Sequence, residues 1–290
     1  MAEVMLEGTV AAMKGLAPIA VVVPCFNDGA SLEAALASLV AQQLPAAEVV
    51  VVDDGSDDPT TVQLLGRLQD LGCPGLADLR VIRQANQGPS AARNTAITAC
   101  TSPWILPLDA DDLLRPTAIK DLWGAALEDS SRGIIYGQVC FFGGRSAVAG
   151  FPAFSESVMA LGNVIPVTAL FRRDAWAAVG GFRLAMARGW EDWDFWLSLL
   201  ERGEQVHQLQ AVVLDVRVKP QSRNRGWSST ERRQAVETLV QHHPAFFGRH
   251  VAVLLDRVSD LEHQRQTSRY EAIKRRLREF WPGGSPAKSQ

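Results

Sequence analysis

The sequence lacks the features that mark several large classes of protein. Its four cysteines, Cys25, Cys73, Cys100 and Cys140, lie far apart and form neither a CxxC pair nor a zinc-ligand spacing. No apolar run approaches the roughly 20 residues that cross a bilayer. The first residues carry neither the basic start nor the apolar stretch of a signal peptide. We therefore expect reduced, mostly buried thiols in a soluble cytoplasmic protein, with peripheral contact at the inner face of the membrane left open.

An excess of charge of one sign is also missing. The chain has 29 lysines and arginines against 32 aspartates and glutamates, a net charge of −3. Such a balance gives no overall basic field, so nucleic acid is not expected as a partner. Hydrophobic residues make up 47% of the 290, which is enough for a core and excludes wholesale disorder. The length suits one large α/β domain with an appendage, or two small domains.

Short apolar runs alternate with helical patterns in the first half of the chain. The runs are short enough for buried parallel strands, and polar loops or helical patterns follow them. The expected strands are 19–23, 49–52, 79–82 and 104–109, and the expected helices are 31–43 with Ser31 as N-cap, 60–71, and one beginning near residue 89 or 90. This alternation is typical of a parallel sheet with right-handed crossovers.

The second half of the chain is less regular. Residues 133–167 mix β-like pieces with Gly-rich turns and show no clean crossover. A helix with Trp176, the stretch GWEDWDFWLSLLERG (189–203) and a strand at 211–218 follow. Beyond residue 219 the chain becomes polar and helical.

Polar side chains gather where three of the expected strands end. They are Asn27 and Asp28 after the first strand, Asp53 and Asp54 after the second, and Asp109, Asp111 and Asp112 after the fourth. Because ligands of such sheets bind beyond the carboxyl ends of the strands, these groups should meet in one crevice. Carboxylates there can bind base and ribose, and two aspartates one residue apart can hold a hard divalent cation. Ordinary turn residues, with Asp112 capping the next helix, are the alternative.

Two further stretches carry candidate residues. Arg93 lies in a helix of small residues, from which it could reach a base or a phosphate; a solvated helix arginine is the alternative. In 189–203, Trp193 and Trp196 recur with two leucines at helical spacing, which favours a core-facing helix. Acids in its first turn suit the helix dipole, yet a carboxylate beside apolar rings also tends toward a raised pKa suited to a general base.

Together these stretches resemble a known family. VVVPCFND, EVVVVDDGSDD, NQGPSAARNTAI, WILPLDADDLL and VGGFRLAMARGWEDWDFWLSLLERG stand in the order seen in inverting glycosyltransferases of family 2. The resemblance covers about residues 18–220. It implies a GT-A fold over 18–226, with a Rossmann-like, mostly parallel α/β sheet flanked by helices. Residues 1–17 would be an N-terminal tail and 227–290 a helical C-terminal extension.

The resemblance also implies roles for single residues. The nucleotide-sugar contacts would be Pro24, Asn27, Asp54, Arg93, Asp109, Glu191 and Lys219, with Asp54 on the base and Asp109 on the ribose. Asp111, with Asp109, would hold Mn²⁺ or Mg²⁺. Asp192 would be the catalytic base, taking a proton from an acceptor hydroxyl that attacks the anomeric carbon while the metal-bound nucleoside diphosphate leaves.

Lys219 departs from the family pattern. Many relatives carry a histidine in a YRxHxxS-like segment, where this chain has VRVKPQS (216–222). An ammonium group cannot ligate a metal as imidazole can, although it can pair with a pyrophosphate. The QxxRW motif of processive members is absent as well, so we expect transfer of single sugars.

The resemblance thus implies a metal-dependent inverting hexosyltransferase in cell-surface glycan or polysaccharide synthesis. A UDP-sugar is the expected donor, with dTDP and GDP sugars as alternatives. The acceptor would be a glycan or a lipid-linked molecule, bound by the loop 141–163 and the tryptophans near Asp192. A catalytically silent nucleotide-sugar-binding module is the rival interpretation. Receiver domains and haloacid-dehalogenase-like phosphatases are disfavoured, because their aspartates follow the first strand.

The extension suggests two kinds of association. Val251, Leu254, Val258 and Leu261 keep a heptad-like spacing that would suit a homodimer. The basic stretch 269–278, followed by Phe280 and Trp281, would suit an anionic membrane surface. A solvated helix is the alternative to both.

Overall fold

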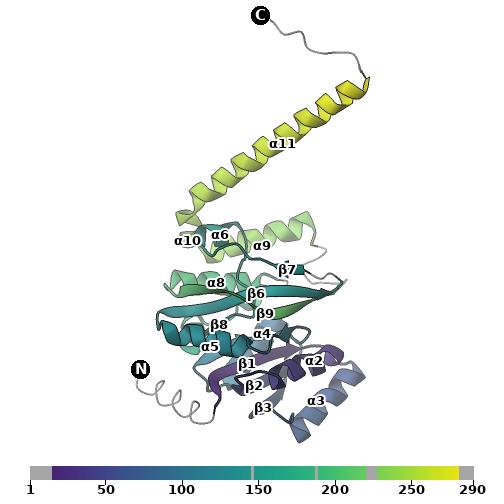
Figure 1. Cartoon of the computed structure of the whole chain (residues 1–290), viewed down its shortest axis with the longest axis vertical. Helices are drawn as coiled ribbons and strands as arrows, with labels where there is room; N and C mark the ends of the chain where they lie inside the picture. Colours follow the sequence, from purple (N-terminus) through teal and green to yellow (C-terminus); the bar gives the residue numbers. More distant parts are fainter. Residues whose placement is uncertain (1–14, 145–146, 187–188, 220–226, 281–290) are drawn as a thin grey trace, which may run out of the picture.

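The computed structural model describes residues 15–144, 147–186, 189–219 and 227–280, with the side chains of the last helix described through residue 268. An α/β body makes up most of the molecule, and one long helix projects from it (Figure 1). The predicted α/β architecture with a helical C-terminal extension is confirmed. Residues 1–14 of the predicted N-terminal tail lie outside the described residues, and the first strand begins at Ala17.

A single sheet forms the centre of the body. Its order in the described residues is β3-β2-β1-β4-β8-β6-β9-β5, with β7 paired to β6. Four neighbouring strands pair in parallel: β1 (Ala17–Cys25), β2 (Ala46–Asp53), β3 (Leu79–Arg83) and β4 (Trp104–Pro107). The other strands are β5 (Leu113–Leu114), β6 (Arg132–Gly143), β7 (Ala147–Ala149), β8 (Leu170–Arg172) and β9 (Gln205–Val218). Strands β6 and β9 also pair in parallel. Because β1 pairs with both β2 and β4, the polar ends of these three strands lie side by side.

Helices cover both faces of the sheet. One face packs against α2 (Gly29–Val40), α3 (Pro59–Leu71) and α5 (Ala118–Glu128). The other packs against α4 (Pro89–Ala99), α7 (Arg173–Val179) and α8 (Glu191–Glu201). Successive side chains of β1 alternate between the two layers, Ile19 and Val21 in the first and Ala20 and Val22 in the second. A strand buried on both faces must be apolar throughout, which is why the run was recognisable in the sequence.

Two predictions of local structure are wrong. The N-cap of α2 is Asp28 rather than Ser31, whose backbone N–H donates to the Asp28 carbonyl within the first turn. Asp112 does not cap a helix, because β5 intervenes and Thr117 precedes α5. The β-like stretch GIIYGQVCFF (133–142) of the irregular region is confirmed, because it lies within the twelve-residue strand β6. A Cβ at Gly137 would lie 2.7 Å from the carbonyl oxygen of Ala211 on β9, so glycine permits this strand pairing.

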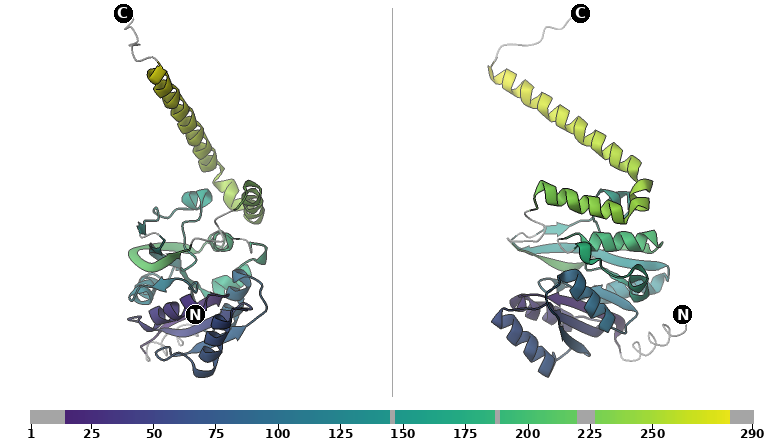
Figure 2. Two further views of the ribbon diagram at one scale, coloured as in Figure 1. Left: turned by 90° about the vertical axis from the view of Figure 1, so that its right-hand side faces the viewer. Right: turned by 180° about the vertical axis from the view of Figure 1, so that it is seen from behind.

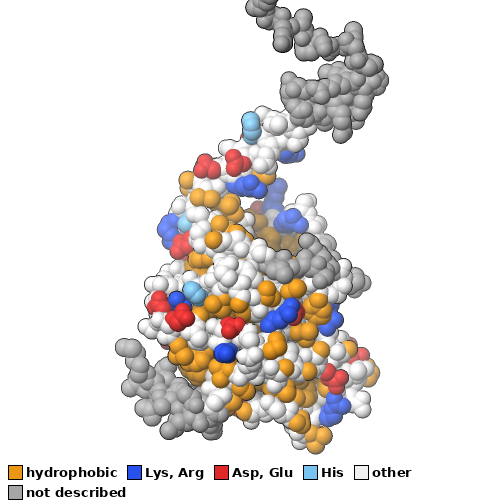
Figure 3. Space-filling view, in the orientation of Figure 1, with side chains coloured by type: hydrophobic (Ala, Val, Ile, Leu, Met, Phe, Trp, Pro, Cys, Tyr) orange, Lys and Arg blue, Asp and Glu red, His pale blue; other side chains and the backbone are white. Residues whose placement is uncertain are grey.

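The charged side chains on the surface agree with the balanced charge of the sequence. Acidic and basic side chains are interspersed on the face in Figure 3. All four cysteines are free, with Cys25 and Cys100 buried and the other two half-buried. Among the described helices, none combines the length and apolarity needed to span a bilayer.

The helical extension begins as part of the body. It consists of α9 (Ser229–His242), α10 (Pro244–Arg249) and α11 (Val251–Phe280). Figure 2 shows α9 lying over α8 on the side away from the sheet, with α11 projecting beyond.

A buried polar network joins α8 to α9 and α10. The carboxylate of Asp194 lies 2.7 Å from His242 Nδ1 and 3.2 Å from His243 Nε2. Arg183 donates to its other oxygen at 2.9 Å. His243 is fully buried, and its Nδ1 lies 2.8 Å from Glu201 Oε2. The extension is therefore bonded to the helix that carries the predicted catalytic base.

His243→Ala is expected to lower the free energy of unfolding by about 2–4 kcal/mol, because it leaves a cavity and removes a partner from two carboxylates. The measurement is urea unfolding followed by tryptophan fluorescence. His263→Ala, at an exposed position of α11, should change stability by less than about 0.5 kcal/mol. Equal effects of the two substitutions would contradict the structural importance of the network.

Candidate active site

The loops after β1 and β2 are locked together by Asn27. Its backbone adopts φ 53°, a left-handed conformation that asparagine tolerates. The side-chain oxygen accepts from the backbone N–H groups of Asp57 and Asp58 at 2.9 and 3.0 Å, and Nδ2 donates to Asp57 Oδ1 at 2.7 Å. Pro24 lies beside this loop, opposite Val52 in the strand register. Asn27 thus fixes the shape of the DDGSDD loop, and nucleotide contact by either residue stays a prediction.

Asp54 holds the loop that leads into α4. The residue is buried, and its Oδ1 accepts from Gln84 Nε2 at 2.7 Å and from the Gln87 N–H at 3.0 Å. Its Oδ2 accepts from the Gly88 N–H at 2.8 Å. Both oxygens are therefore engaged within the protein. Base recognition by Asp54 stays a prediction.

Arg93 is not the solvated helix arginine that the sequence left as an alternative. Its side chain is 1% exposed and lies between two acids. Nη2 donates to Asp109 Oδ1 at 2.6 Å, and Nη1 donates to Glu191 Oε1 at 3.0 Å. Burial alone would lower the pKa of Arg93, but Asp109 and Glu191 raise it above its usual value. One guanidinium thus joins the end of β4 to the first turn of α8.

The three aspartates after β4 form an acidic shelf. Oxygen atoms of Asp109, Asp111 and Asp112 lie within 4.8 Å of one another. Asp112 is buried, and its Oδ1 accepts from the Arg217 N–H at 2.8 Å. Burial and the neighbouring Asp109 raise the pKa of Asp112 to about 8. Asp109 and Asp111 remain half-exposed, and carboxylate oxygens are the ligands that hard divalent cations prefer, so the pair fits Mg²⁺ or Mn²⁺.

Lys219 lies on this shelf. Its Nζ is 2.9 Å from Asp111 Oδ2 and 2.5 Å from Asp28 Oδ2. Burial alone would lower the pKa of Lys219, but its hydrogen bonds to Asp28 and Asp111 raise it, so the group is charged at neutral pH. The structure therefore brings Lys219 to the predicted metal ligand. Residues 220–222 of the same segment lie outside the described residues.

The hydrogen bonds of Arg93 to Asp109 and Glu191 are called the Arg93 bridge below. Asp192 lies at the Glu191 end of this bridge, in the first turn of α8. The side chain is half-buried, and Asn163 Nδ2 donates to its Oδ2 at 2.9 Å. Its Oδ1 accepts from the Trp193 N–H at 2.8 Å. Burial, and next the charge of Glu191, raise the pKa of Asp192 to about 7. A carboxylate with such a pKa can both ionise near neutral pH and hold a proton, as a general base must.

The tryptophans around Asp192 divide into core and surface. Trp193 and Trp196 are buried and pack in the core, as the core-helix interpretation predicted. Trp190 is half-buried and has φ 63° immediately before α8. Its ring centroid lies 5.5 Å from that of Trp193 and 5.0 Å from that of Trp227. The sequence prediction missed Trp227, whose only signal was a large aromatic residue at the start of a polar segment.

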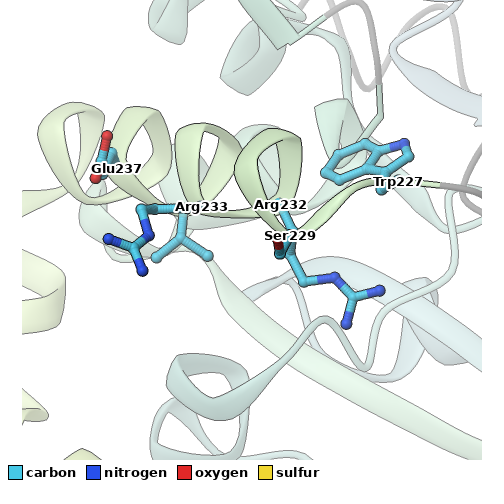
Figure 4. Close-up of a pocket in the computed structure, with 6 residues that line it drawn as sticks. Trp227, Ser229, Arg232, Arg233 and Glu237 are labelled. Atoms are coloured by element: carbon cyan, nitrogen blue, oxygen red, sulfur yellow. The ribbon is translucent and has the colours of Figure 1, made fainter.

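Two hollows adjoin Trp227. One, of about 220 Å³, lies between α9 and the turn η1 (Leu184–Met186) and is lined by Met186, Gly189 and Gln234. The other is open, measures about 780 Å³ and runs along α9 past Arg232 and Arg233 (Figure 4). Both basic side chains extend from the same side of the helix in that view. Trp227, which packs against Trp190 immediately before α8, thus adjoins two hollows.

Part of the sequence is similar to proteins of a known family. Residues 20–154 match the family model described as Glycosyl transferase family 2. Chondroitin synthase of Escherichia coli is 26% identical over 205 residues, 68% of this chain and 28% of that protein. Succinoglycan biosynthesis protein ExoU of Rhizobium meliloti is 39% identical over 105 residues, 36% of this chain and 29% of that protein. The chain thus spans less than a third of the length of these relatives.

Solved structures share the fold. TarS residues 1–349 of S. aureus, in complex with UDP-GlcNAc, superposes with a TM-score of 0.64 at 19% identity, over 77% of this chain and 66% of that chain. The same TarS segment bound to UDP superposes with a TM-score of 0.62 at 20% identity, over 77% of this chain and 64% of that chain. Residues 20–154 thus resemble glycosyl transferase family 2, and the described residues share the GT-A architecture of TarS.

Proposed function

We propose that the protein moves a single sugar from a nucleoside-diphosphate sugar to an acceptor hydroxyl with inversion. The observation that carries the proposal is the Arg93 bridge. It joins Asp109 on the acidic shelf to Glu191, the neighbour of Asp192. A donor on the shelf and a base on α8 would then belong to one site. The family match and the glycan-synthesising relatives support the same activity.

The donor would lie over the carboxyl ends of β1, β2 and β4. Asp54 would recognise the base, Asp109 the ribose, and Asp111 with Asp109 would hold Mn²⁺ or Mg²⁺. When bound, the metal offsets negative charge that grows on the diphosphate as it leaves. The UDP and UDP-GlcNAc complexes of TarS favour a UDP-sugar.

Asp192 would act on the acceptor. Its carboxylate would take the proton of the attacking hydroxyl, and Asn163 would fix the orientation of that carboxylate. Because the attack and the departure of the diphosphate occur on opposite sides of the anomeric carbon, a single displacement inverts its configuration. Relatives named for chondroitin and succinoglycan favour a cell-surface glycan as the acceptor.

A thermal-shift screen of nucleotide sugars, with and without Mn²⁺, tests the donor side. We expect one donor to raise the melting temperature only in the presence of metal. Stabilisation without metal would contradict the assignment of Asp111. Release of nucleoside diphosphate with a panel of glycan acceptors then separates an enzyme from a silent binding module, which would bind the donor and release nothing.

The rate should depend on the ionisation of Asp192. Because kcat/KM reports the pKa of groups in the free enzyme, it should fall tenfold per pH unit below about 7 and level off above. The base must be deprotonated to act, so activity is lost on the acid side. A steady-state profile between pH 5 and 9 measures this. A profile that stays flat down to pH 5 would contradict a raised pKa at the base.

Trp190 and Trp227 would form an acceptor surface, since sugar rings stack on aromatic faces. Trp227→Leu is expected to raise the KM for the acceptor about tenfold, equal to about 1.4 kcal/mol, without changing the KM for the donor. Trp123→Leu is the matched control, because Trp123 is also half-buried and contacts one other tryptophan, Trp104. Equal effects of both substitutions on the acceptor KM would contradict a local role of Trp227.

The projecting α11 would mediate association. Of the four heptad residues, Leu254 packs against the body, whereas Val251, Val258 and Leu261 are exposed together with Leu255. The predicted basic stretch 269–278 has its side chains outside the described residues. We propose a homodimer through the exposed stripe and a peripheral contact with anionic lipid at the inner face of the membrane. Light scattering tests the homodimer and liposome co-sedimentation tests the membrane contact, each with the full chain and with a truncation after Arg249. A molecular mass that does not change on truncation would contradict the homodimer through α11, and unchanged liposome binding would contradict the membrane contact.

A further inference from the structure

The acidic shelf already carries a cation supplied by the chain itself. Lys219 Nζ lies 2.9 Å from Asp111 Oδ2, the oxygen of the proposed metal ligand, and 2.5 Å from Asp28 Oδ2. The side chain is 37% exposed, so it is partly desolvated yet has room to move. Asp28 is the N-cap of α2 but makes no side-chain cap hydrogen bond, because its carboxylate faces Lys219 instead. The ammonium thus connects the loop after β1, the loop after β4 and the end of β9.

The segment that bears Lys219 is fastened to the shelf. The Arg217 N–H donates to Asp112 Oδ1 at 2.8 Å, and Arg217 Nε donates to the Asp111 carbonyl at 3.1 Å. The guanidinium also lies over the ring of Phe142, 4.6 Å from its centroid. With its backbone held in this way, Lys219 can change partner only through its flexible four-carbon chain.

A divalent ion and this ammonium compete for one oxygen. Metal–oxygen bonds of Mg²⁺ and Ca²⁺ measure about 2.0–2.6 Å, so an ion on Asp111 Oδ2 would lie close to Nζ as the structure has it. The two positive groups would repel each other at that distance. The diphosphate of a donor removes the conflict, because its oxygens can accept both the metal and the ammonium.

We propose that Lys219 is a built-in counter-cation of the acidic shelf, which pairs with Asp111 while the donor is absent and turns to the donor diphosphate when metal and nucleotide bind. This inference rests on the proposed nucleotide-sugar site. It makes the binding of metal conditional on the nucleotide. A metal-ligating histidine at this position would add a ligand for the ion in the free enzyme. Lys219 instead competes with the ion for Asp111.

Mn²⁺ binding without any turnover tests this, by the electron paramagnetic resonance signal of free Mn²⁺ in titrations of the full chain. Without nucleotide, Lys219→Met should bind Mn²⁺ at least tenfold more tightly than the wild type. With UDP present, the wild type should bind Mn²⁺ more tightly than Lys219→Met. Lys219→Met should also bind UDP with Mn²⁺ at least tenfold more weakly than the wild type. Lys120→Met, at an exposed position of α5, should match the wild type in both titrations.

Two further arms keep the outcomes distinct. Asp111→Asn combined with Lys219→Met should lose the tighter Mn²⁺ binding, which assigns the ion to Asp111. Equal Mn²⁺ affinities of wild type and Lys219→Met without nucleotide would overturn the role of Lys219, as would no Mn²⁺ binding to either. If the wild type with Mn²⁺ binds none of UDP, dTDP and GDP, the proposed donor site fails, while the nucleotide-free comparison still decides the competition at Asp111.

Discussion

Asp192→Asn is expected to lower kcat by a factor of about 10² to 10⁴, the usual contribution of a general base. An amide cannot accept the proton of the acceptor hydroxyl, although it preserves the shape of the side chain. The residue lies on α8, whereas the residues proposed to hold the base, the ribose and the metal, Asp54, Asp109 and Asp111, follow strands of the sheet, so the Kd for UDP with Mn²⁺ should change by less than about twofold. Single-turnover transfer and calorimetric titration with UDP measure the two quantities separately.

A close structural match to Asp192 serves as the control. Asp174, in the first turn of α7, also accepts a hydrogen bond from the N–H of its following residue, Ala175, at 2.8 Å. Asp174→Asn should leave kcat unchanged. This side chain is exposed, and it lies on α7 rather than on α8, which carries the Glu191 end of the Arg93 bridge. Wild-type turnover by Asp192→Asn would exclude Asp192 as the base. A large loss of UDP affinity would instead assign it to the donor.

Arg93→Met is expected to lower the free energy of unfolding by about 3–5 kcal/mol, the cost of removing one partner from a buried ion pair. The substitution leaves Asp109 and Glu191 without the cation that now lies 2.6 and 3.0 Å from them. Activity should be lost as well, since the two halves of the site are no longer joined. Chemical denaturation with paired transfer assays measures both effects.

Two companion variants separate charge from geometry. Arg93→Lys keeps the charge but cannot reach both acids with a planar fork, so it should recover part of the stability and little of the activity. Arg67→Met removes an ion pair of similar length, 2.6 Å to Glu33, whose side chains are 59% and 61% exposed. It should cost no more than about 1 kcal/mol, because solvent screens exposed pairs. Comparable losses from Arg93→Met and Arg67→Met would contradict the importance assigned to the bridge.

The strands of the parallel half could be predicted closely because burial on both faces leaves a continuous apolar run. β2 was expected at 49–52 and spans Ala46–Asp53, and β3 was expected at 79–82 and spans Leu79–Arg83. The placement of the loops that bear Asp54, Asp109 and Asp111 at one edge of the sheet followed from topology alone, since parallel strands end at one edge. The apolar face of α8 was equally readable from its spacing.

Side-chain partners from distant segments could not be predicted in this way. Nothing local indicates that Arg93 contacts Glu191, 98 positions away, or that Lys219 reaches Asp28, 191 positions away. Asp112 appeared to be a helix cap because its true partner, the backbone of Arg217, comes from β9. Trp227 and the buried His243 lie in a segment without any family motif, and only tertiary packing brings them to α8.

The claim that the acidic shelf and Asp192 serve one reaction is tested most directly by a crystal structure with Mn²⁺ and the nucleotide sugar that most stabilises the protein. We predict Mn²⁺ on Asp111, the base beside Asp54, and the anomeric carbon of the sugar facing the Asp192 carboxylate. A donor bound elsewhere, for example in the hollow along α9, or a sugar turned away from Asp192, would contradict the claim.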